Sequence, residues 1–187
     1  KAAKKLMTAL LVLEALDRAE IALTDSVQIS PRAAAMKGSQ ALLDANAVYP
    51  LEDLLRTTIM ASANDSAVAL SEYIAGSEEN FVDRMNRRAA ELGMTNTNYV
   101  NCTGYPQSGQ YTTARDVCRL CCEIAKHPRY NQYASVWIDK LTHPGGRVTD
   151  LTNTNRLVRF YEGCDGYKTG STDAAKYCLA ATAEKNG

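Results

Sequence analysis

The sequence of 187 residues has no excess of charge of either sign, because 21 lysines and arginines are matched by 21 aspartates and glutamates. A chain without net charge has no field that would draw it to nucleic acid or to an acidic membrane surface. It also has no apolar run long enough to span a bilayer and no visible signal peptide. We therefore expect no nucleic-acid partner, and a membrane contact only through segments that are absent from this chain.

The sequence offers little that could hold a metal ion. Cys118 and Cys121 form one C-x-x-C pair, but no second pair follows, and the only histidines, His127 and His143, lie beyond it. Structural zinc sites need paired elements of this kind, so we expect neither a metal nor another cofactor. Cys118 and Cys122 fall four residues apart in an apolar helical stretch. The six cysteines are therefore interpreted as small buried side chains rather than as disulfide partners.

Hydrophobic residues make up 45% of the chain and charged residues 22%, which is typical of a soluble globular protein. We expect one domain over residues 1–187, without internal repeats. Apolar spacing and capping residues predict helices at 4–20, 64–75, 77–92 and 114–126. Alternating β-rich stretches predict strands at 24–30, 135–141, 147–153 and 175–184, and we interpret residues 164–172 as a turn that enters a strand.

Three short polar stretches stand out from this pattern. Lys5 lies near the start of an otherwise apolar helix, where a lysine directed into the core needs a partner or must lose its proton. Taken alone, Lys5 is more simply interpreted as facing water beside Lys4. Ser62 and Asn64 lie one residue apart where the next helical pattern begins, and serine and asparagine are also ordinary helix caps. The third stretch is Lys168-Thr169-Gly170, followed by Ser171 and Thr172, which we place at the start of a strand. Its glycine allows close approach to the backbone, and its lysine and hydroxyls suit a carboxylate.

Taken together, these three elements resemble the signature of the penicillin-recognising serine enzymes. Longer stretches resemble the low-molecular-mass penicillin-binding proteins that act as D-alanyl-D-alanine carboxypeptidases: "KLMTALLVLEAL", "SANDSAVALSEYIAGS", "LGMTNTNYVNCTG", "GQYTTARD", "TNTN" and "DGYKTGSTDAAKYCLAATA". The resemblance covers essentially the whole chain. Each three-residue motif is weak alone, and their order and separation make the set specific.

The first element departs from the family. There it is S-x-x-K, in which serine and lysine share a helix face, so that the amine can take the hydroxyl proton. Three residues before Lys5 the sequence has Ala2. Either the serine has been replaced by alanine, which would give a non-catalytic binding protein, or a serine between Ala2 and Ala3 is missing from the sequence, for example because it carries an acyl group. We favour the second explanation.

The resemblance also implies roles for single residues. Lys5 would be the general base, Ser62 would relay a proton to the leaving amine, and Asn64 would bind the substrate backbone and Lys5. Lys168 would attract the terminal carboxylate and lower the pKa of Lys5. The remaining site residues would be Thr169 and Thr172, whose hydroxyls face the carboxylate, Gly170, Ser171, whose backbone amide helps to form the oxyanion hole, and Thr103.

The fold implied by the resemblance is α+β and β-lactamase/transpeptidase-like, an antiparallel sheet flanked by helices with an all-helical lobe. The strands that precede the first helix in relatives, and the last strand, are not expected in this chain. The implied function is an extracytoplasmic serine-type carboxypeptidase that acts on peptidoglycan stem peptides ending in D-Ala-D-Ala and is trapped by β-lactams. A β-lactamase is a weaker alternative, because no E-x-x-x-N glutamate precedes Lys168.

Overall fold

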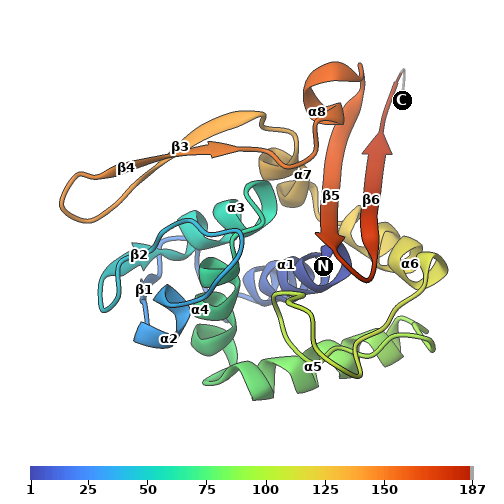
Figure 1. The fold of residues 1–187 in the computed structure, drawn as a ribbon, viewed down its shortest axis with the longest axis horizontal. Coiled ribbons are helices and arrows are strands. Elements are labelled where there is room, and N and C mark those ends of the chain that lie inside the picture. The colour runs from blue at the N-terminus through green and yellow to red at the C-terminus, as the bar shows by residue number, and fades with distance from the viewer. Residues whose placement is uncertain (186–187) are drawn as a thin grey trace.

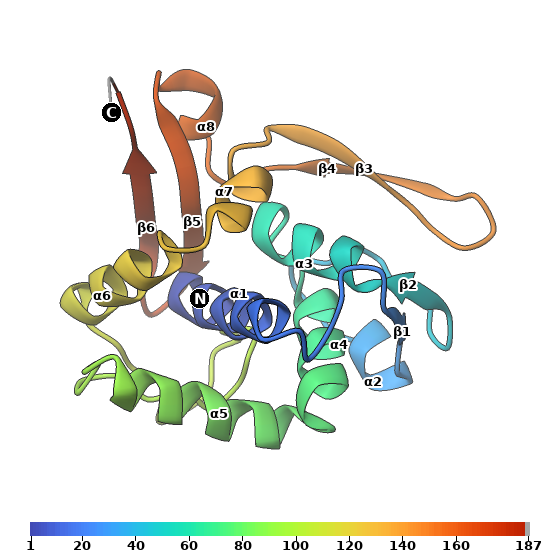
Figure 2. The ribbon, with the colours of Figure 1, turned by 180° about the vertical axis from the view of Figure 1, so that it is seen from behind.

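The computed structural model describes residues 1–185 and is organised around one buried helix, α1 (Ala2–Asp17), which runs through the middle of the molecule (Figure 2). Twelve of its sixteen residues are buried, so the helix has almost no solvent face. Leu6, Met7, Leu10 and Leu13 are fully buried. Helices α3 to α7 and the strands β5 and β6 all contact α1, so α1 fixes their positions relative to one another.

The helical lobe consists of α3 (Leu51–Met60), α4 (Asn64–Ala75) and α5 (Glu78–Glu91), with α6 (Ala114–Ile124) beside α1 (Figure 1). Its helix ends follow local rules. The side chains of Ser77 and Thr113 cap α5 and α6 by accepting backbone N–H groups, and Gly76 ends α4 with a φ of +78°. Three short helices complete the set: α2 (Pro31–Ala34), α7 (Pro128–Ala134) and α8 (Leu157–Phe160).

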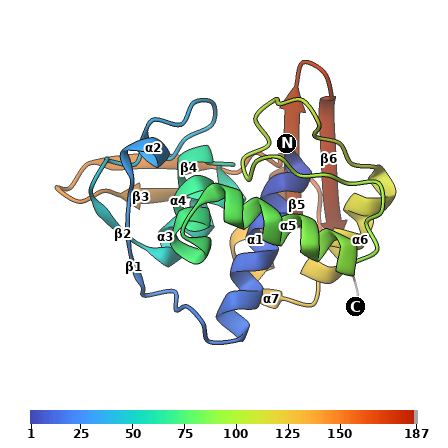
Figure 3. The same cartoon turned by 90° about the horizontal axis from the view of Figure 1, so that it is seen from below.

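The strands form three antiparallel pairs, which are β1 (Ser26–Gln28) with β2 (Val48–Pro50), β3 (Ile138–Thr142) with β4 (Val148–Thr152), and β5 (Cys164–Thr172) with β6 (Lys176–Ala183). The β3–β4 hairpin extends across α3, whereas one end of β5 lies beside the first turn of α1 (Figures 1 and 3). In the β5–β6 pair, Lys168 is opposite Ala180 and Gly170 is opposite Cys178.

Most of the predicted elements are confirmed, with shifted ends. The helix predicted at 4–20 spans Ala2–Asp17 instead, and the chain leaves it through Ala19, whose φ is +54°. The placement of K-T-G at the start of a strand is wrong, because β5 already begins at Cys164. Helix α7, which begins at Pro128, was not predicted, although proline is common in a first helical turn.

The interpretation of the cysteines as buried side chains is right for Cys102 and Cys164 and wrong for Cys118, Cys122 and Cys178, which are exposed. Helix α6 packs inward through Leu120 and Ile124. Cys118 and Cys122 are four residues apart, as Leu120 and Ile124 are. Each cysteine precedes one of these core residues by two positions, or about 200° of helix rotation, so the cysteines lie on the opposite face. No pair of the six cysteines, all within the described residues, forms a disulfide.

Candidate active site

The side chain of Lys5 points from the first turns of α1 into the protein and is 1% exposed. Its amine donates to the side-chain oxygen of Asn64, with Nζ and Oδ1 2.5 Å apart, and to the backbone oxygen of Thr103 at 2.7 Å. These partners follow Lys5 by 59 and 98 residues. The fold thus brings together the first two of the three polar stretches.

Burial lowers the pKa of Lys5 well below its usual value, and the positive charge of Lys168 lowers it further. Both effects disfavour the ammonium form. Lys5 therefore loses its proton at a lower pH than an exposed lysine does, and an uncharged amine can accept a proton.

Asn64 is the first residue of α4 and is completely buried. Asn64 is held by a loop, residues 37–39, that no sequence motif connects with the site. The backbone N–H of Asn64 donates to the carbonyl of Ser39 at 2.7 Å, and its side-chain amide donates to the carbonyl of Lys37 at 2.6 Å. At Gly38, a Cβ would lie 2.9 Å from the Asn64 amide nitrogen, so this close approach needs glycine.

Ser62 lies in the turn between α3 and α4, is 4% exposed, and has a φ of +59°, in the left-handed region that non-glycine residues seldom adopt. Strained backbone of this kind is common at functional sites. The short turn keeps Ser62 next to Asn64, which contacts Lys5 directly.

Lys168 lies in β5 and is 1% exposed. Its amine donates to the hydroxyl of Thr154 at 2.9 Å and to the carbonyl of Thr169 at 3.3 Å. Burial, followed by the positive charge of Lys1, lowers its pKa to about 7. The amine therefore changes charge near neutral pH, and a carboxylate that binds beside it would restore the positive form.

Ala2 lies where the chemistry would need a nucleophile. At Gly170 a Cβ would be 2.4 Å from the backbone nitrogen of Ala2, and at Gly104 a Cβ would be 2.5 Å from the Cα of Lys1. The start of α1 is thus enclosed by two glycines, one on β5 and one on the loop after Thr103. This packing places the Ala2 amide against the K-T-G strand.

A cavity of about 410 Å³ opens beside these glycines and is lined by Lys1, Gly38, Gly104, Tyr105, Pro106, Ser171, Thr172 and Asp173. It receives two of the predicted residues, Ser171 and Thr172. The hydroxyl oxygen of Thr172 accepts the N–H of Ala175 in the β5–β6 turn, which leaves its proton and one lone pair for a ligand. Thr103 contributes its carbonyl to Lys5, while its hydroxyl accepts the N–H of Tyr105.

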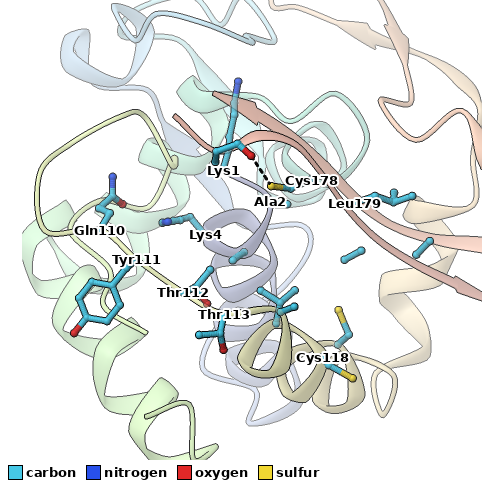
Figure 4. Close-up of a pocket in the computed structure, with 17 residues that line it drawn as sticks. Lys1, Ala2, Lys4, Gln110, Tyr111, Thr112, Thr113, Cys118, Cys178 and Leu179 are labelled. Carbon is cyan, nitrogen blue, oxygen red and sulfur yellow. Dashed lines mark hydrogen bonds between the residues drawn. The ribbon is translucent and has the colours of Figure 1, made fainter. Parts of the chain in front are cut away.

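A larger cavity, of about 620 Å³, lies between the start of α1, α6 and β6 (Figure 4). Its walls include Lys4, Tyr111, Cys118 and Cys178, and none of the predicted site residues lines it. Ala2, at the place of the nucleophile, lines this larger cavity, whereas Ser171 and Thr172 line the smaller one. We take the smaller cavity as the candidate site because of those two residues. Within residues 1–185, no group of three or more histidine, cysteine, aspartate or glutamate side chains is arranged to hold a metal ion.

The family model described as D-alanyl-D-alanine carboxypeptidase matches residues 2–187. The chain belongs to the D-alanyl-D-alanine carboxypeptidase family. It is 42% identical, over 181 residues, to the D-alanyl-D-alanine carboxypeptidase DacF of Bacillus subtilis. The matched region covers 97% of this chain and 46% of the relative. The chain thus spans about half the length of the curated relatives that it matches.

Solved structures agree with this membership. Penicillin binding protein 5 from Haemophilus influenzae is 33% identical with a TM-score of 0.90, over 99% of this chain and 54% of that one. Penicillin-Binding Protein D2 from Listeria monocytogenes, solved in an ampicillin-bound form, is 32% identical with a TM-score of 0.78, over 100% of this chain and 74% of that one. The expected α+β, transpeptidase-like fold is confirmed. Among residues 1–185, no helix is both long and apolar enough to cross a membrane.

Proposed function

We propose that the protein to which this chain belongs is a serine-type D-Ala-D-Ala carboxypeptidase of the cell envelope. It removes the terminal D-alanine from peptidoglycan stem peptides through an acyl-enzyme. The observation that carries the proposal is the burial of two lysines, Lys5 and Lys168, so near each other that the positive charge of Lys168 helps to lower the pKa of Lys5. Family membership supports the same activity.

The hydrogen bonds of Lys5 suit a general base. A neutral lysine amine has two hydrogens and one lone pair. Both hydrogens are used, one by the Asn64 side chain and one by the Thr103 carbonyl. The lone pair is then free to take the proton of a serine hydroxyl one helical turn earlier, at the place of Ala2.

Lys168 takes the role of carboxylate receptor. Its ammonium attracts the terminal carboxylate of the peptide, and the hydroxyls of Thr169 and Thr172 donate to it. The backbone amide of Ser171, together with that of the nucleophile, stabilises the oxyanion, and one such donor is worth roughly 3 kcal/mol of barrier. Gly170 lets β5 lie close to Ala2, because a Cβ at Gly170 would be 2.4 Å from the Ala2 backbone nitrogen. Ser62 passes the proton to the leaving D-alanine amine, and water then hydrolyses the acyl-enzyme.

β-Lactams are the expected inhibitors. The Listeria relative was solved in an ampicillin-bound form, and this chain is similar to it over its whole length. A strained lactam carbonyl placed between Lys5 and the Ser171 amide would acylate the same serine, with the lactam carboxylate on Lys168.

Ala2 supports a second candidate, a non-catalytic homologue that binds D-Ala-D-Ala ends or β-lactams without reacting. An alanine at this place has no oxygen to acylate. A β-lactamase has no comparable support, since family membership points to the carboxypeptidases.

Labelling with a fluorescent penicillin, followed by intact-mass measurement, separates these candidates. We expect no adduct on the protein with Ala2, and one penicilloyl group per chain on either Ala2→Ser or a variant with serine inserted between Ala2 and Ala3. The gene sequence decides which form is natural. Failure of both folded serine variants to react would refute the proposed site, and rapid release of the adduct would indicate a β-lactamase instead.

A further inference from the structure

The carbonyl that holds Lys5 belongs to a short turn, residues 101–104, that α1 contacts at two successive peptide groups. The hydroxyl of Thr8 donates to the carbonyl of Cys102 at 3.1 Å, and the amine of Lys5 donates to the carbonyl of Thr103 at 2.7 Å. Thr8 follows Lys5 by three residues and shares its helix face. Both contacts require that residues on the side of the turn away from α1 also fix its position.

That hold comes from Glu78, the first residue of α5. One carboxylate oxygen of Glu78 accepts the backbone N–H of Cys102 at 3.0 Å. The peptide groups on either side of Cys102 are therefore fixed by α5 and by α1. Glu78 is 7% exposed and Cys102 is fully buried, so water does not replace this contact.

The second oxygen of Glu78 pairs with the guanidinium of Arg32, from α2, at 2.5 Å. Arg32 also reaches Glu72 on α4, at 3.4 Å. A carboxylate that is hydrogen-bonded at both oxygens has little freedom to rotate. Glu78 is thus oriented by Arg32, and it transfers that orientation to the 101–104 turn.

We propose that Glu78 is a positioning residue for the proposed reaction: through the backbone of Cys102 it sets the place of the Thr103 carbonyl, and hence the direction of the Lys5 amine. Glu78 touches neither the cleft nor the substrate, and nothing in the sequence motifs marks it. The inference rests on the proposed role of Lys5 as general base.

The test uses three substitutions with two readouts. Glu78→Ala removes both contacts, and Glu78→Asp keeps the charge but shortens the side chain by one methylene. Glu72→Gln is the matched control, because it alters the other carboxylate on Arg32 and leaves the Cys102 contact intact. The first readout is the midpoint of the pH titration of Lys5 in the chain with Ala2. It is measured by nitrogen NMR on protein with isotopically labelled lysine.

We expect the Lys5 midpoint to rise by about one pH unit or more in Glu78→Ala and by less in Glu78→Asp, because a released amine becomes hydrated. Glu72→Gln should leave it unchanged. The second readout is acylation by penicillin in an Ala2→Ser background. A displacement of this kind should slow acylation roughly tenfold or more, with little change in the concentration that half-saturates the site.

An unchanged Lys5 titration in a folded Glu78→Ala or Glu78→Asp protein would overturn the inference, as would an equal shift in Glu72→Gln. If Glu78→Ala does not fold, Glu78→Asp carries the test. If the Lys5 titration shifts but the parent with serine is never acylated, the positioning role stands and the proposed function fails.

Discussion

Binding of a peptide that ends in D-Ala-D-Ala should take up a proton at Lys168. Its amine is buried, and its pKa of about 7 means that it is a cation below neutral pH and an uncharged amine above it. The peptide carboxylate favours the cation, so above pH 7 binding must first recharge the amine. The protein with Ala2 suits this measurement, because without a hydroxyl at that place the peptide can bind without turnover.

The magnitude follows from the shift. Each pH unit above the free pKa of Lys168 should cost about a factor of ten in affinity, or about 1.4 kcal/mol. Affinity should therefore be level below about pH 6 and fall about fiftyfold between pH 7 and pH 9. At pH 8.5, nearly one proton should enter the complex for each peptide bound.

Isothermal titration calorimetry in two buffers of different ionisation enthalpy measures that uptake directly. Lys168→Arg is the control, because a guanidinium keeps its charge at every pH of the assay and should remove both the slope and the proton uptake. An affinity that stays constant from pH 6 to pH 9 in the unsubstituted protein would refute the assignment of Lys168 as a titrating carboxylate receptor.

Three further outcomes are expected. Gly170→Ala should weaken peptide binding by about tenfold or more in a fluorescence titration, because its Cβ would lie 2.4 Å from the Ala2 nitrogen and must push β5 away from α1; unchanged binding would contradict this packing. Leu10→Ala, at a fully buried position of α1, should lower the free energy of unfolding by about 2–5 kcal/mol in urea, and a loss below 1 kcal/mol would count against α1 as the core helix. Unfolding free energy should also rise from pH 7 to about pH 9.5, since the unfolded chain binds more protons at Lys5 and Lys168 than the folded chain does. Lys168→Met should make that rise smaller, because only Lys5 then contributes to it.

The sequence predicts best those parts of the fold whose signal is local. The helix predicted at 77–92 is α5, Glu78–Glu91, with Ser77 as its cap. The helix predicted at 114–126 is α6, Ala114–Ile124, with Thr113 as its cap. Such signals act within one turn of helix. The exposed faces of α6 and β6 depend instead on what packs against them, so the burial of Cys118 and Cys178 was predicted wrongly.

The site divides in the same way. Lys5, Asn64 and Lys168 are predicted as site residues because the proposed chemistry demands particular side chains at those places. The groups that hold them are mostly backbone carbonyls, those of Lys37, Ser39 and Thr103. Any residue has a carbonyl, so no residue type reveals these contacts in a single sequence. Gly38 is the exception, because the close approach of Asn64 leaves no room for a Cβ there.

The proposed chemistry depends on Lys5, which α1 carries, but the groups that hold the Lys5 amine in place come from other elements. Helix α1 fixes Lys5 and Thr8 relative to each other by its own geometry, since residues three apart share a face. A general base also needs its two hydrogen-bond acceptors in fixed places, and these come from α4 and from the 101–104 turn, 59 and 98 residues away. Because each acceptor has its own support, loss of the one at Glu78 should misdirect the amine without unfolding the helix that carries it.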